Sequence, residues 1–373
     1  MTTTPTAAAA ACPACGASVP PRARFCESCG AGLDQAAGGA ASPTTPDAAE
    51  DSHEIAPISA PTRRPSGALP DPQVQAGAVD RCADCGATVG PDGYCTECGA
   101  KAPSPRDHFR EQPASWVAGV CDKGVGKAGN EDAMALLAGR EPGSRAVLIV
   151  LDGVSNSLHS AKASLAGAKA ARDVLRLPLP TGLGTPAGRE AAVTKVLTTA
   201  VSAANNAIVA GTDPGSPNPA SATIVFAVLE GRRIHYAGVG DSRAYWLPDT
   251  EPGVQLTVDD SLAQDQIAAG VPRQDAEASP QAHAITKWLG RDAEDIAPRI
   301  GHLDVTAAGW LLVCSDGLWN YASEPAALQR QIAASGTTDP AELALALVGF
   351  ANAAGGHDNI TVALARVKAE LDG

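Results

Sequence analysis

The chain has 373 residues, a formal net charge of −13 and an apolar fraction of 45%. Its length allows about two or three domains, and the apolar fraction is ample for a sizeable core. The acidic balance argues against a protein that binds the phosphate backbone of nucleic acids. No window approaches about eighteen uninterrupted apolar residues, and the N-terminus lacks a signal-peptide pattern, so we expect a cytoplasmic protein without a membrane span.

Eight of the ten cysteines fall before residue 100, where they form four Cys-x-x-Cys pairs. The pairs divide into two similar segments, residues 10–32 and 80–101, each holding two pairs separated by nine or ten residues. Four thiolates at this spacing can enclose Zn²⁺ in a tetrahedral site, whereas a disulfide framework is rare in a cytosolic chain. We therefore predict two zinc ribbons with one structural zinc ion each. The expected ligands are Cys12, Cys15, Cys26 and Cys29 in the first ribbon and Cys82, Cys85, Cys95 and Cys98 in the second.

Such small ribbons cannot fold by burying a core, so the metal would supply the folding free energy. Their surfaces carry charges of both signs, and Phe25 and Tyr94 are their aromatic residues. A nucleic-acid adaptor would favour a basic, aromatic surface, so interaction with a protein, or tethering to one, is the preferred role. Residues 33–79 between the ribbons are rich in Ala, Pro, Ser, Thr and Gly and predict a disordered linker.

A shorter linker is predicted over residues 102–114, ahead of a large domain at 115–370 that alternates strands and helices. Strands are predicted at residues 115–120, 146–151, 223–230, 233–240, 310–315 and 360–367. Helices are predicted at residues 161–176, 189–210, 261–269 and 340–352. The strands at residues 223–230 and 233–240 are predicted to form a hairpin that turns at Glu230-Gly231. Hairpins with helices grouped between them favour an α+β fold over a doubly wound parallel sheet.

Acidic residues stand at the ends of several apolar strands. Asp152 follows VLIVL, Asp316 follows WLLVCS, Asp358 precedes ITVALARV, Asp241 lies in GVGDSRAYW, and Glu131 and Asp132 lie in GNEDA. Each could be an ordinary turn residue, but converging carboxylates resist ionisation unless a cation lies between them. Oxygen ligands without a nearby His or Cys cluster favour Mg²⁺ or Mn²⁺. The residues alone therefore indicate a binuclear metal hydrolase that acts on a phosphoester.

Seven motifs make a more specific resemblance. They are DKGVGKAGNED (122–132), VLDG (150–153), GDSRAYWL (240–247), LTVDDS (256–261), ITKWLG (285–290), VCSDGLWN (313–320) and GGHDNITV (355–362). In order and spacing they resemble the metal-dependent Ser/Thr protein phosphatases of the type 2C family, over residues 115 to 368. The resemblance implies a four-layer αββα sandwich of two antiparallel sheets flanked by helix pairs, with the metals at one end.

The resemblance also implies roles for single residues. Asp152 corresponds to the carboxylate that bridges two metal ions, and Asp316 and Asp358 to the other ligands of the first ion. The Gly153 carbonyl corresponds to a ligand of the second ion. The remaining implied positions are Glu131 and Asp132 near the second ion, Asp241 at a third, weaker ion, Lys127 at the substrate phosphate and Asn359 beside the last ligand.

The implied reaction is hydrolysis of phosphoserine or phosphothreonine by a hydroxide that bridges two Mn²⁺ or Mg²⁺ ions, without a phosphoenzyme. The implied partners are phosphorylated proteins, with a Ser/Thr kinase acting in opposition. The ribbons could recruit such a kinase, a regulator or a second copy of the chain. Residues 262–284 correspond to a mobile flap over the site, with an amphipathic helix and loop as the alternative.

Two departures from the family pattern matter. Lys127 stands where arginine is common, so it keeps the charge but loses bidentate geometry. The family's usual DGMGGH or DGH run reads DGVSNS here, with Ser155 and Ser157 in place of glycine and histidine, so the family's candidate general acid is missing from its place. His159 could replace it, or water could protonate the leaving group. These departures motivate the alternative of a catalytically weak pseudophosphatase that binds phosphopeptides. Cys121 and Cys314 are expected to be small buried side chains rather than nucleophiles.

Overall fold

Two compact units divide the chain, Met1–Ala68 and Leu69–Gly373. The computed structural model describes strands β1 (Ala10–Ala11), β2 (Ser18–Val19) and β3 (Val74–Gln75), then residues 81–82, 85–90, 94–100, 102, 104–154, 157, 159–181 and 184–368. The cysteines predicted for the first ribbon, at residues 10–32, and most of the predicted linker at 33–79 lie outside the described residues.

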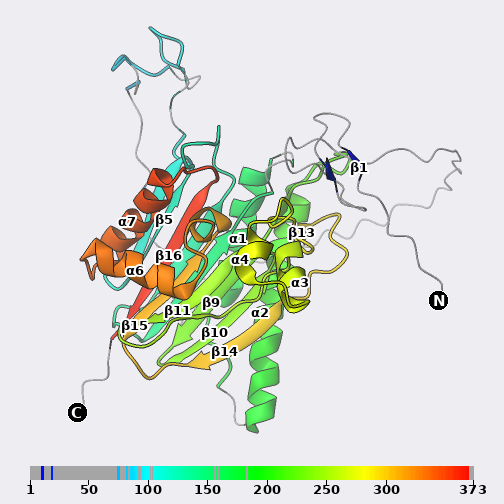
Figure 1. Cartoon of the computed structure of the whole chain (residues 1–373), viewed down its shortest axis with the longest axis vertical. Helices are drawn as coiled ribbons and strands as arrows, with labels where there is room; N and C mark the ends of the chain where they lie inside the picture. The colour runs from blue at the N-terminus through cyan, green and yellow to red at the C-terminus, as the bar shows by residue number, and fades with distance from the viewer. Residues whose placement is uncertain are drawn as a thin grey trace, which may run out of the picture. The chain divides into compact units, whose positions relative to one another are not determined.

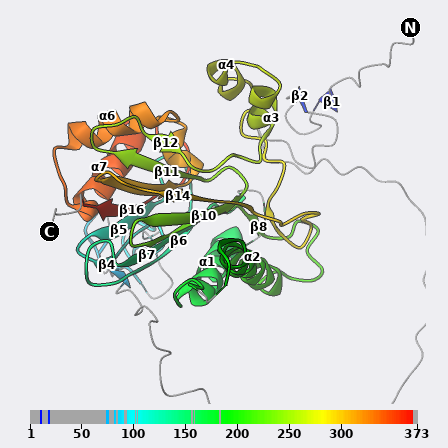
Figure 2. The same cartoon turned by 90° about the horizontal axis from the view of Figure 1, so that it is seen from below.

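An antiparallel sheet of five strands forms one half of the large domain (Figure 1). Its spatial order is β14 (Arg299–Asp304), β10 (Arg233–Val239), β9 (Ile224–Glu230), β7 (Arg145–Leu151) and β6 (Ala133–Ala138). Helices α1 (Ser160–Leu175) and α2 (Pro186–Ala210) cover its outer face, as Figure 2 shows. Their buried residues form one apolar core with the sheet.

A second antiparallel sheet of seven strands forms the other half. Its order is β12 (Val254–Gln255), β11 (Arg243–Pro248), β15 (Gly309–Cys314), β16 (Ile360–Val367), β5 (Val117–Asp122), β4 (His108–Ala114) and β3. Its outer face is covered by α5 (Asp316–Trp319), α6 (Pro325–Ser335) and α7 (Pro340–Ala353). A core shared by both sheets fills the space between them.

Successive side chains of the central strands point to opposite faces of each sheet, and both faces are buried in these layers. On β7, Ile149 points to the core with α1 and α2, while Val150 points to the core between the sheets. On β15, Leu311 faces the other sheet and Leu312 faces the helices. Because both faces of each strand are buried, the strands read as continuous apolar runs. The predicted αββα sandwich is confirmed, and the strands and helices predicted from periodicity lie close to their expected bounds. β6, β11, β14, α5 and α6 were not predicted, and neither was α4 (Arg273–Glu277).

Smaller elements connect the layers. β8 (Ser221–Ala222) pairs with β13 (Leu289–Gly290), and the turn at Glu230-Gly231 joins β9 to β10 as predicted. Residues 261–284 hold α3 (Leu262–Ala268) and α4 (Arg273–Glu277), which share a small apolar cluster of their own. Within the described part of the chain, no helix combines the length and apolarity needed to cross a bilayer.

The linker predicted at residues 102–114 requires a correction, because residues 108–114 form β4. This strand pairs with β5 and carries the short β3, which itself lies inside the range predicted as the longer linker. Phe109 and Glu111 are buried, while His108 and Arg110 are exposed, so the period is that of a strand. The pattern was missed because one of its two inward residues is a glutamate, which hides the apolar alternation.

Candidate metal centre

Strand pairing gathers the acidic residues at one end of the two sheets. In the five-stranded sheet, Ala133 pairs with Leu151, so Asp132 and Asp152 stand side by side where β6 begins and β7 ends. In the seven-stranded sheet, the pairing of β15 with β16 brings Asp316 beside Asp358: Ser315 donates its backbone N–H to the Thr361 carbonyl at 3.2 Å. Residues far apart in sequence therefore share one region.

Asp152 lies at the centre of this group. Burial raises the pKa of its carboxyl well above the ordinary value, and the charges of Asp132, Asp316, Asp358 and Asp241 raise it further. Four like charges act on one buried carboxyl, so the group resists full ionisation in the absence of positive charge. This is the electrostatic setting in which a bound cation would be stabilised.

Two carboxylates in the group have an oxygen with unmet hydrogen-bonding capacity. Asp132 accepts hydrogen bonds on Oδ2 from Ser315 Oγ at 2.7 Å and from Thr361 Oγ1 at 2.6 Å. Its Oδ1 and the Oδ1 of Asp316 are buried without a hydrogen-bond partner. Burial raises the pKa of Asp132 to about 7, despite the two hydroxyl donors. A buried acceptor without a donor is costly, and a divalent cation would satisfy it.

In both Asp-Gly pairs, a close backbone contact leaves room only for glycine. A Cβ on Gly153 would lie 2.6 Å from the Glu131 carbonyl oxygen, and one on Gly317 would clash with the Asn359 carbonyl. The first contact sets the Gly153 backbone against Glu131, whose carboxylate accepts a hydrogen bond from Ser160 Oγ. Gly153 and Glu131, the two residues assigned near a second ion, are therefore neighbours.

Asn359 connects two of the acidic segments. Its Oδ1 accepts the backbone N–H of Glu131 at 2.8 Å, and its Nδ2 donates to the carbonyls of Lys123 and Gly129 at 2.8 and 2.9 Å. Its own backbone N–H donates to Oδ1 of Asp358 at 2.7 Å. Asn359 is 2% exposed, so all four hydrogen bonds are made by a buried residue. Asn359 therefore orients the acidic loop around Glu131 relative to Asp358.

Lys127 brings a positive charge to the group. Its Nζ lies 2.8 Å from Oδ1 of Asp358. Partial burial alone would lower the lysine pKa, but the hydrogen bond and charge of Asp358, with the charges of Asp152 and Asp316, raise it overall. The ammonium group is thus charged and stands at the edge of the acidic cluster, where it could contact a phosphate.

Asp241 is 4% exposed, and burial followed by the charges of Asp316 and Asp259 raises its pKa well above the ordinary value. Trp319 Nε1 donates to the Asp241 carbonyl at 2.9 Å. The guanidinium of Arg243 lies 3.6 Å from the centre of the Trp319 ring and pairs with Asp259. Asp241 is therefore buried near the other acidic residues and is supported by Trp319 and Arg243.

The donor set fits hard divalent cations such as Mg²⁺ or Mn²⁺, because it consists of carboxylate and carbonyl oxygens. Cys121 and Cys314 are buried nearby, and burial raises the pKa of Cys121 to about 12 and that of Cys314 further. A thiol held in its protonated form is a poor nucleophile and a poor metal ligand. Their position agrees with the small buried role expected for them.

The second predicted zinc ribbon forms a separate cluster. The Sγ atoms of Cys82, Cys85, Cys95 and Cys98 all lie within 4.8 Å of one another. Backbone N–H groups of Cys98 and Glu97 lower the pKa of Cys95 to about 6, as a metal-binding thiolate requires. Among the described residues this is the tightest group of metal-ligating atoms, so the carboxylate cluster is the looser of the two sites.

Some site residues were not foreseen from the sequence. Ser315 and Thr361 support Asp132, and Arg243 and Trp319 support Asp241. Each lies within a motif noted above, VCSDGLWN, GGHDNITV or GDSRAYWL, but nothing in the motif says which side chain it contacts. The order and spacing of the motifs identify the segments that hold these residues but not the side chains that they contact.

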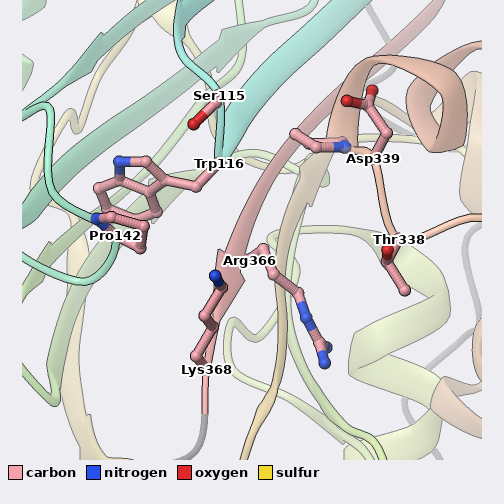
Figure 3. A pocket seen from close by; sticks show the side chains of 8 residues that line it. Ser115, Trp116, Pro142, Thr338, Asp339, Arg366 and Lys368 are labelled. Carbon is pink, nitrogen blue, oxygen red and sulfur yellow. The ribbon is translucent and has the colours of Figure 1, made fainter.

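A hollow at the opposite end of the sandwich is unrelated to this chemistry. It has a volume of about 430 Å³, and Figure 3 shows its lining. It is lined by Ser115, Trp116, Pro142, Thr338, Asp339, Pro340, Arg366 and Lys368. The hollow includes Arg366 and Lys368 at the end of β16 and Pro142 just before β7, whereas Asp358 and Asp152 stand at the other ends of these two strands. Arg366 is already paired with Asp249 at 2.6 Å.

Comparison with curated proteins gives relatives of one kind. The chain is 39% identical to the protein phosphatase PhpP of Streptococcus pneumoniae over 147 residues, which are 39% of this chain and 57% of PhpP. It is 32% identical to the serine/threonine protein phosphatase PstP of Mycobacterium tuberculosis over 173 residues, which are 46% of this chain and 32% of PstP. The chain thus spans a little over half of the first relative and about a third of the second.

Solved structures extend the likeness across the large domain. The structure of the M. tuberculosis phosphatase PstP/Ppp superposes with a TM-score of 0.55 and 27% identity, over 68% of this chain and 98% of that one. The S. agalactiae serine/threonine phosphatase superposes with a TM-score of 0.57 over 68% of this chain and 99% of that one. At 24% identity, this second match shows the fold alone.

Family models match both parts of the chain. Residues 12–99 match the double zinc ribbon model. Residues 125–347, more than half of the 373 residues, match the model of protein phosphatase 2C. The type 2C resemblance drawn from the seven motifs is thereby confirmed, and the chain belongs to the protein phosphatase 2C family.

Proposed function

We propose that this chain is a metal-dependent protein phosphatase that hydrolyses phosphoserine and phosphothreonine. The observation that carries the proposal is the pair of buried carboxylate oxygens without a donor, Asp132 Oδ1 and Asp316 Oδ1, beside the raised pKa of Asp152. The fold has no reason to bury these atoms together unless a cation satisfies them. The named phosphatases PhpP and PstP support the reaction class.

In this proposal the site residues have separate tasks. Asp152, Asp316 and Asp358 would hold the first ion, and Asp152 with the Gly153 carbonyl would hold the second. Glu131 and Asp132 would lie beside the second ion, and Asp241 would lie beside a third. When bound, the divalent ions lower the pKa of a water molecule and neutralise the phosphoryl oxygens.

The residues around the ions orient the substrate and the ligands. Lys127 binds the phosphate as a point charge, since its ammonium group stands at the edge of the cluster. Asn359 fixes the distance between the Glu131 segment and Asp358 through its three side-chain hydrogen bonds. Most of the catalytic effect in such a site comes from placing charges rather than from covalent chemistry.

Manganese is the first cation to test. The catalytic domain of a PstP phosphatase has been solved with two manganese ions, at 28% identity to this chain. Hard oxygen ligands accept both Mn²⁺ and Mg²⁺. We propose that this site binds two such ions and a third more weakly.

The zinc ribbons serve as interaction or tethering modules in this proposal. The four thiols of the second ribbon suit one structural zinc ion, and the first ribbon, by its matching sequence, would hold another. A Ser/Thr kinase or a regulator, in a cytoplasmic signalling pair of the bacterial type, is the proposed partner. We place the ribbons at residues 10–32 and 80–101 and the phosphatase domain from β4 to residue 370.

The test is turnover by the full chain with p-nitrophenyl phosphate and a phosphothreonine peptide. Activity is expected with Mn²⁺ or Mg²⁺ and is expected to disappear in EDTA. Asp316→Asn should lower kcat by roughly 100-fold or more, the scale of losing one electrostatic stabiliser of the transition state. Asp213→Asn, at an exposed carboxylate outside the acidic cluster, is the matched control and should be unaffected.

A second candidate function uses the same pocket for binding alone. It is favoured by Lys127 in place of arginine and by Ser157 in place of histidine. Such a pseudophosphatase would bind the phosphopeptide and manganese in calorimetry yet show no turnover with either substrate. Full activity in EDTA would contradict both functions.

A further inference from the structure

A histidine from the flap region stands near the acidic cluster. His283 lies between α4 and β13, in the segment drawn in yellow in Figure 1. The centre of its ring is 5.9 Å from that of Trp319, with the planes tilted by 34°. Trp319 ends α5, the short helix that begins at Asp316. His283 therefore contacts one end of α5, and the proposed metal ligand Asp316 lies at the other end of this short helix.

The backbone around His283 is held in place on both sides. The preceding Ala282 is 3% exposed and packs with Ala263 and Ala276 in the small core of α3 and α4. The following Ala284 accepts the backbone N–H of Leu262 at 2.9 Å. The histidine side chain itself is exposed, so it projects from an anchored backbone toward solvent.

The same segment is tied to the loop that carries Asp241. Thr286 donates its backbone N–H to the Asp260 carbonyl at 2.8 Å, and Asp260 donates its own to the Gly240 carbonyl at 2.8 Å. Gly240 immediately precedes Asp241. These backbone hydrogen bonds hold the segment that carries His283 in a fixed position beside the acidic cluster.

Electrostatics agrees with this placement. Burial and the charge of Asp358 raise the pKa of Asp316, while the charge of His283 is among the effects that lower it. His283 therefore belongs to the electrostatic surroundings of Asp316, in agreement with its ring contact with Trp319.

We infer that His283 is the general acid that protonates the seryl or threonyl oxygen as the phosphoester bond breaks. This inference rests on the proposed function. Ser157 stands where the family has its candidate general acid, so that role is open in this chain. The inference gives the role to His283, which comes from the flap region.

The step balances in atoms and charge. Water forms a new bond to phosphorus, and the bond from phosphorus to the seryl or threonyl oxygen breaks with its electron pair on that oxygen. The imidazolium N–H of His283 gives its proton to this oxygen, so the product is a neutral alcohol. The attacking water releases a proton to solvent, and the exposed His283 regains one from solvent. Imidazole is suited to this exchange because it titrates near neutral pH.

The other histidine considered from the sequence is placed differently. His159 is exposed and precedes α1 in a left-handed conformation, with φ of 65°. Its side chain makes no hydrogen bond to cap that helix. His159 is therefore the matched control for the experiment, since it is a second exposed histidine close to the Asp-Gly motif in sequence.

The test compares two substrates that differ in their need for a proton. An alkoxide leaves poorly unless it is protonated, whereas p-nitrophenolate leaves as an anion. With the full chain and Mn²⁺, His283→Gln should lower kcat on the phosphothreonine peptide by roughly 100-fold, the usual contribution of general acid catalysis. Its kcat on p-nitrophenyl phosphate should stay within about threefold of the wild type, because this leaving group needs no acid. His159→Gln should leave both rates within about threefold.

The outcomes separate this inference from the proposed function. Equal losses on both substrates by His283→Gln, no loss on either, or a peptide-selective loss in His159→Gln would each overturn the role of His283. Rescue of peptide turnover in His283→Ala by added imidazole would support it and would show that the variant is folded. A wild type that hydrolyses neither substrate with Mn²⁺ would overturn the proposed function, and this inference with it.

Discussion

Lys127 Nζ lies 2.8 Å from Oδ1 of Asp358, and that same oxygen accepts the backbone N–H of Asn359 at 2.7 Å. One carboxylate oxygen is therefore held by two donors, one of them charged. The relationship couples the residue proposed to bind phosphate to a residue proposed to bind metal. The consequence of having lysine rather than arginine at position 127 can therefore be tested by substitution.

Substitution of Lys127 tests its role at the phosphate. Lys127→Arg should lower KM for p-nitrophenyl phosphate by about threefold to tenfold, because a guanidinium contacts phosphate through two parallel hydrogen bonds. Lys127→Met should raise KM by about tenfold, since it removes a charge-assisted hydrogen bond. Steady-state kinetics at saturating Mn²⁺ measures both.

Lys287 provides the control for that experiment, because it too pairs with an aspartate, Asp295, at 2.6 Å. Lys287→Met should leave KM unchanged. If it raised KM as much as Lys127→Met does, the effect would reflect general loss of surface charge rather than contact with the phosphate.

Removal of the central carboxylate should change activity and stability in opposite directions. Asp152→Asn should abolish metal-dependent turnover, because Asp152 is the carboxylate proposed to serve both ions. Without metal, the same variant should gain about 1 kcal/mol in free energy of unfolding, since a carboxyl repelled by its neighbours is replaced by a neutral amide. Urea unfolding in EDTA measures the gain.

Metal addition completes this test. Mn²⁺ at about 100 times its Kd should stabilise the wild type by roughly 2.7 kcal/mol and should have a much smaller effect on Asp152→Asn. Equal stabilisation of the two proteins by Mn²⁺ would remove Asp152 from the metal site. Asp213→Asn is again the neutral comparison.

Glu111 on β4 predicts a stability change with pH. Burial raises the pKa of its carboxyl to about 7, although a hydrogen bond from the Leu136 backbone N–H at 2.7 Å opposes the shift. The folded state therefore binds the proton more tightly than the unfolded chain does. The contribution is fully present below about pH 4.5 and is lost as pH rises toward 7, with a total of up to about 3 kcal/mol.

Glu111→Gln should remove this pH dependence, because glutamine still accepts the Leu136 N–H and does not ionise. Relative to the wild type, its free energy of unfolding should increase between pH 4.5 and 8, as measured by urea denaturation at each pH. Glu141→Gln, at an exposed turn, should follow the wild type. A constant difference between Glu111→Gln and the wild type across this range would contradict the buried, protonated state.

The second ribbon gives a prediction about zinc. Cys95→Ser should remove one equivalent of zinc from the purified chain, because the Cys95 thiolate is one of four ligands within a single cluster. Hydrolysis of p-nitrophenyl phosphate should persist, since its proposed residues all lie in the large domain. Thr96→Ser, at the neighbouring exposed position, should keep its zinc, as measured by metal analysis. Unchanged zinc content in Cys95→Ser would contradict the ribbon.

The central strands and their terminal aspartates were accessible from the sequence. VLIVL and WLLVCS are long apolar runs whose burial is a local property, and each ends in the same Asp-Gly pair. Repetition of that pattern is enough to predict buried strands and clustered carboxylates. By contrast, β4 escaped prediction because one of its inward side chains, Glu111, is ionisable and mimics a surface residue.

The amino-acid order thus predicted an α+β fold, the zinc-ribbon cysteines and the set of acidic residues, because periodicity, Cys-x-x-Cys spacing and strand-end aspartates are all local signals. The αββα arrangement of the layers was implied by the resemblance to the type 2C phosphatases. Only the folded chain decided which groups meet. Ser315 and Thr361 reach Asp132 across 183 and 229 residues of sequence, and His283 approaches Asp316 through Trp319. Such contacts depend on strand register and on packing between the flap and the sheet ends, which no local pattern encodes.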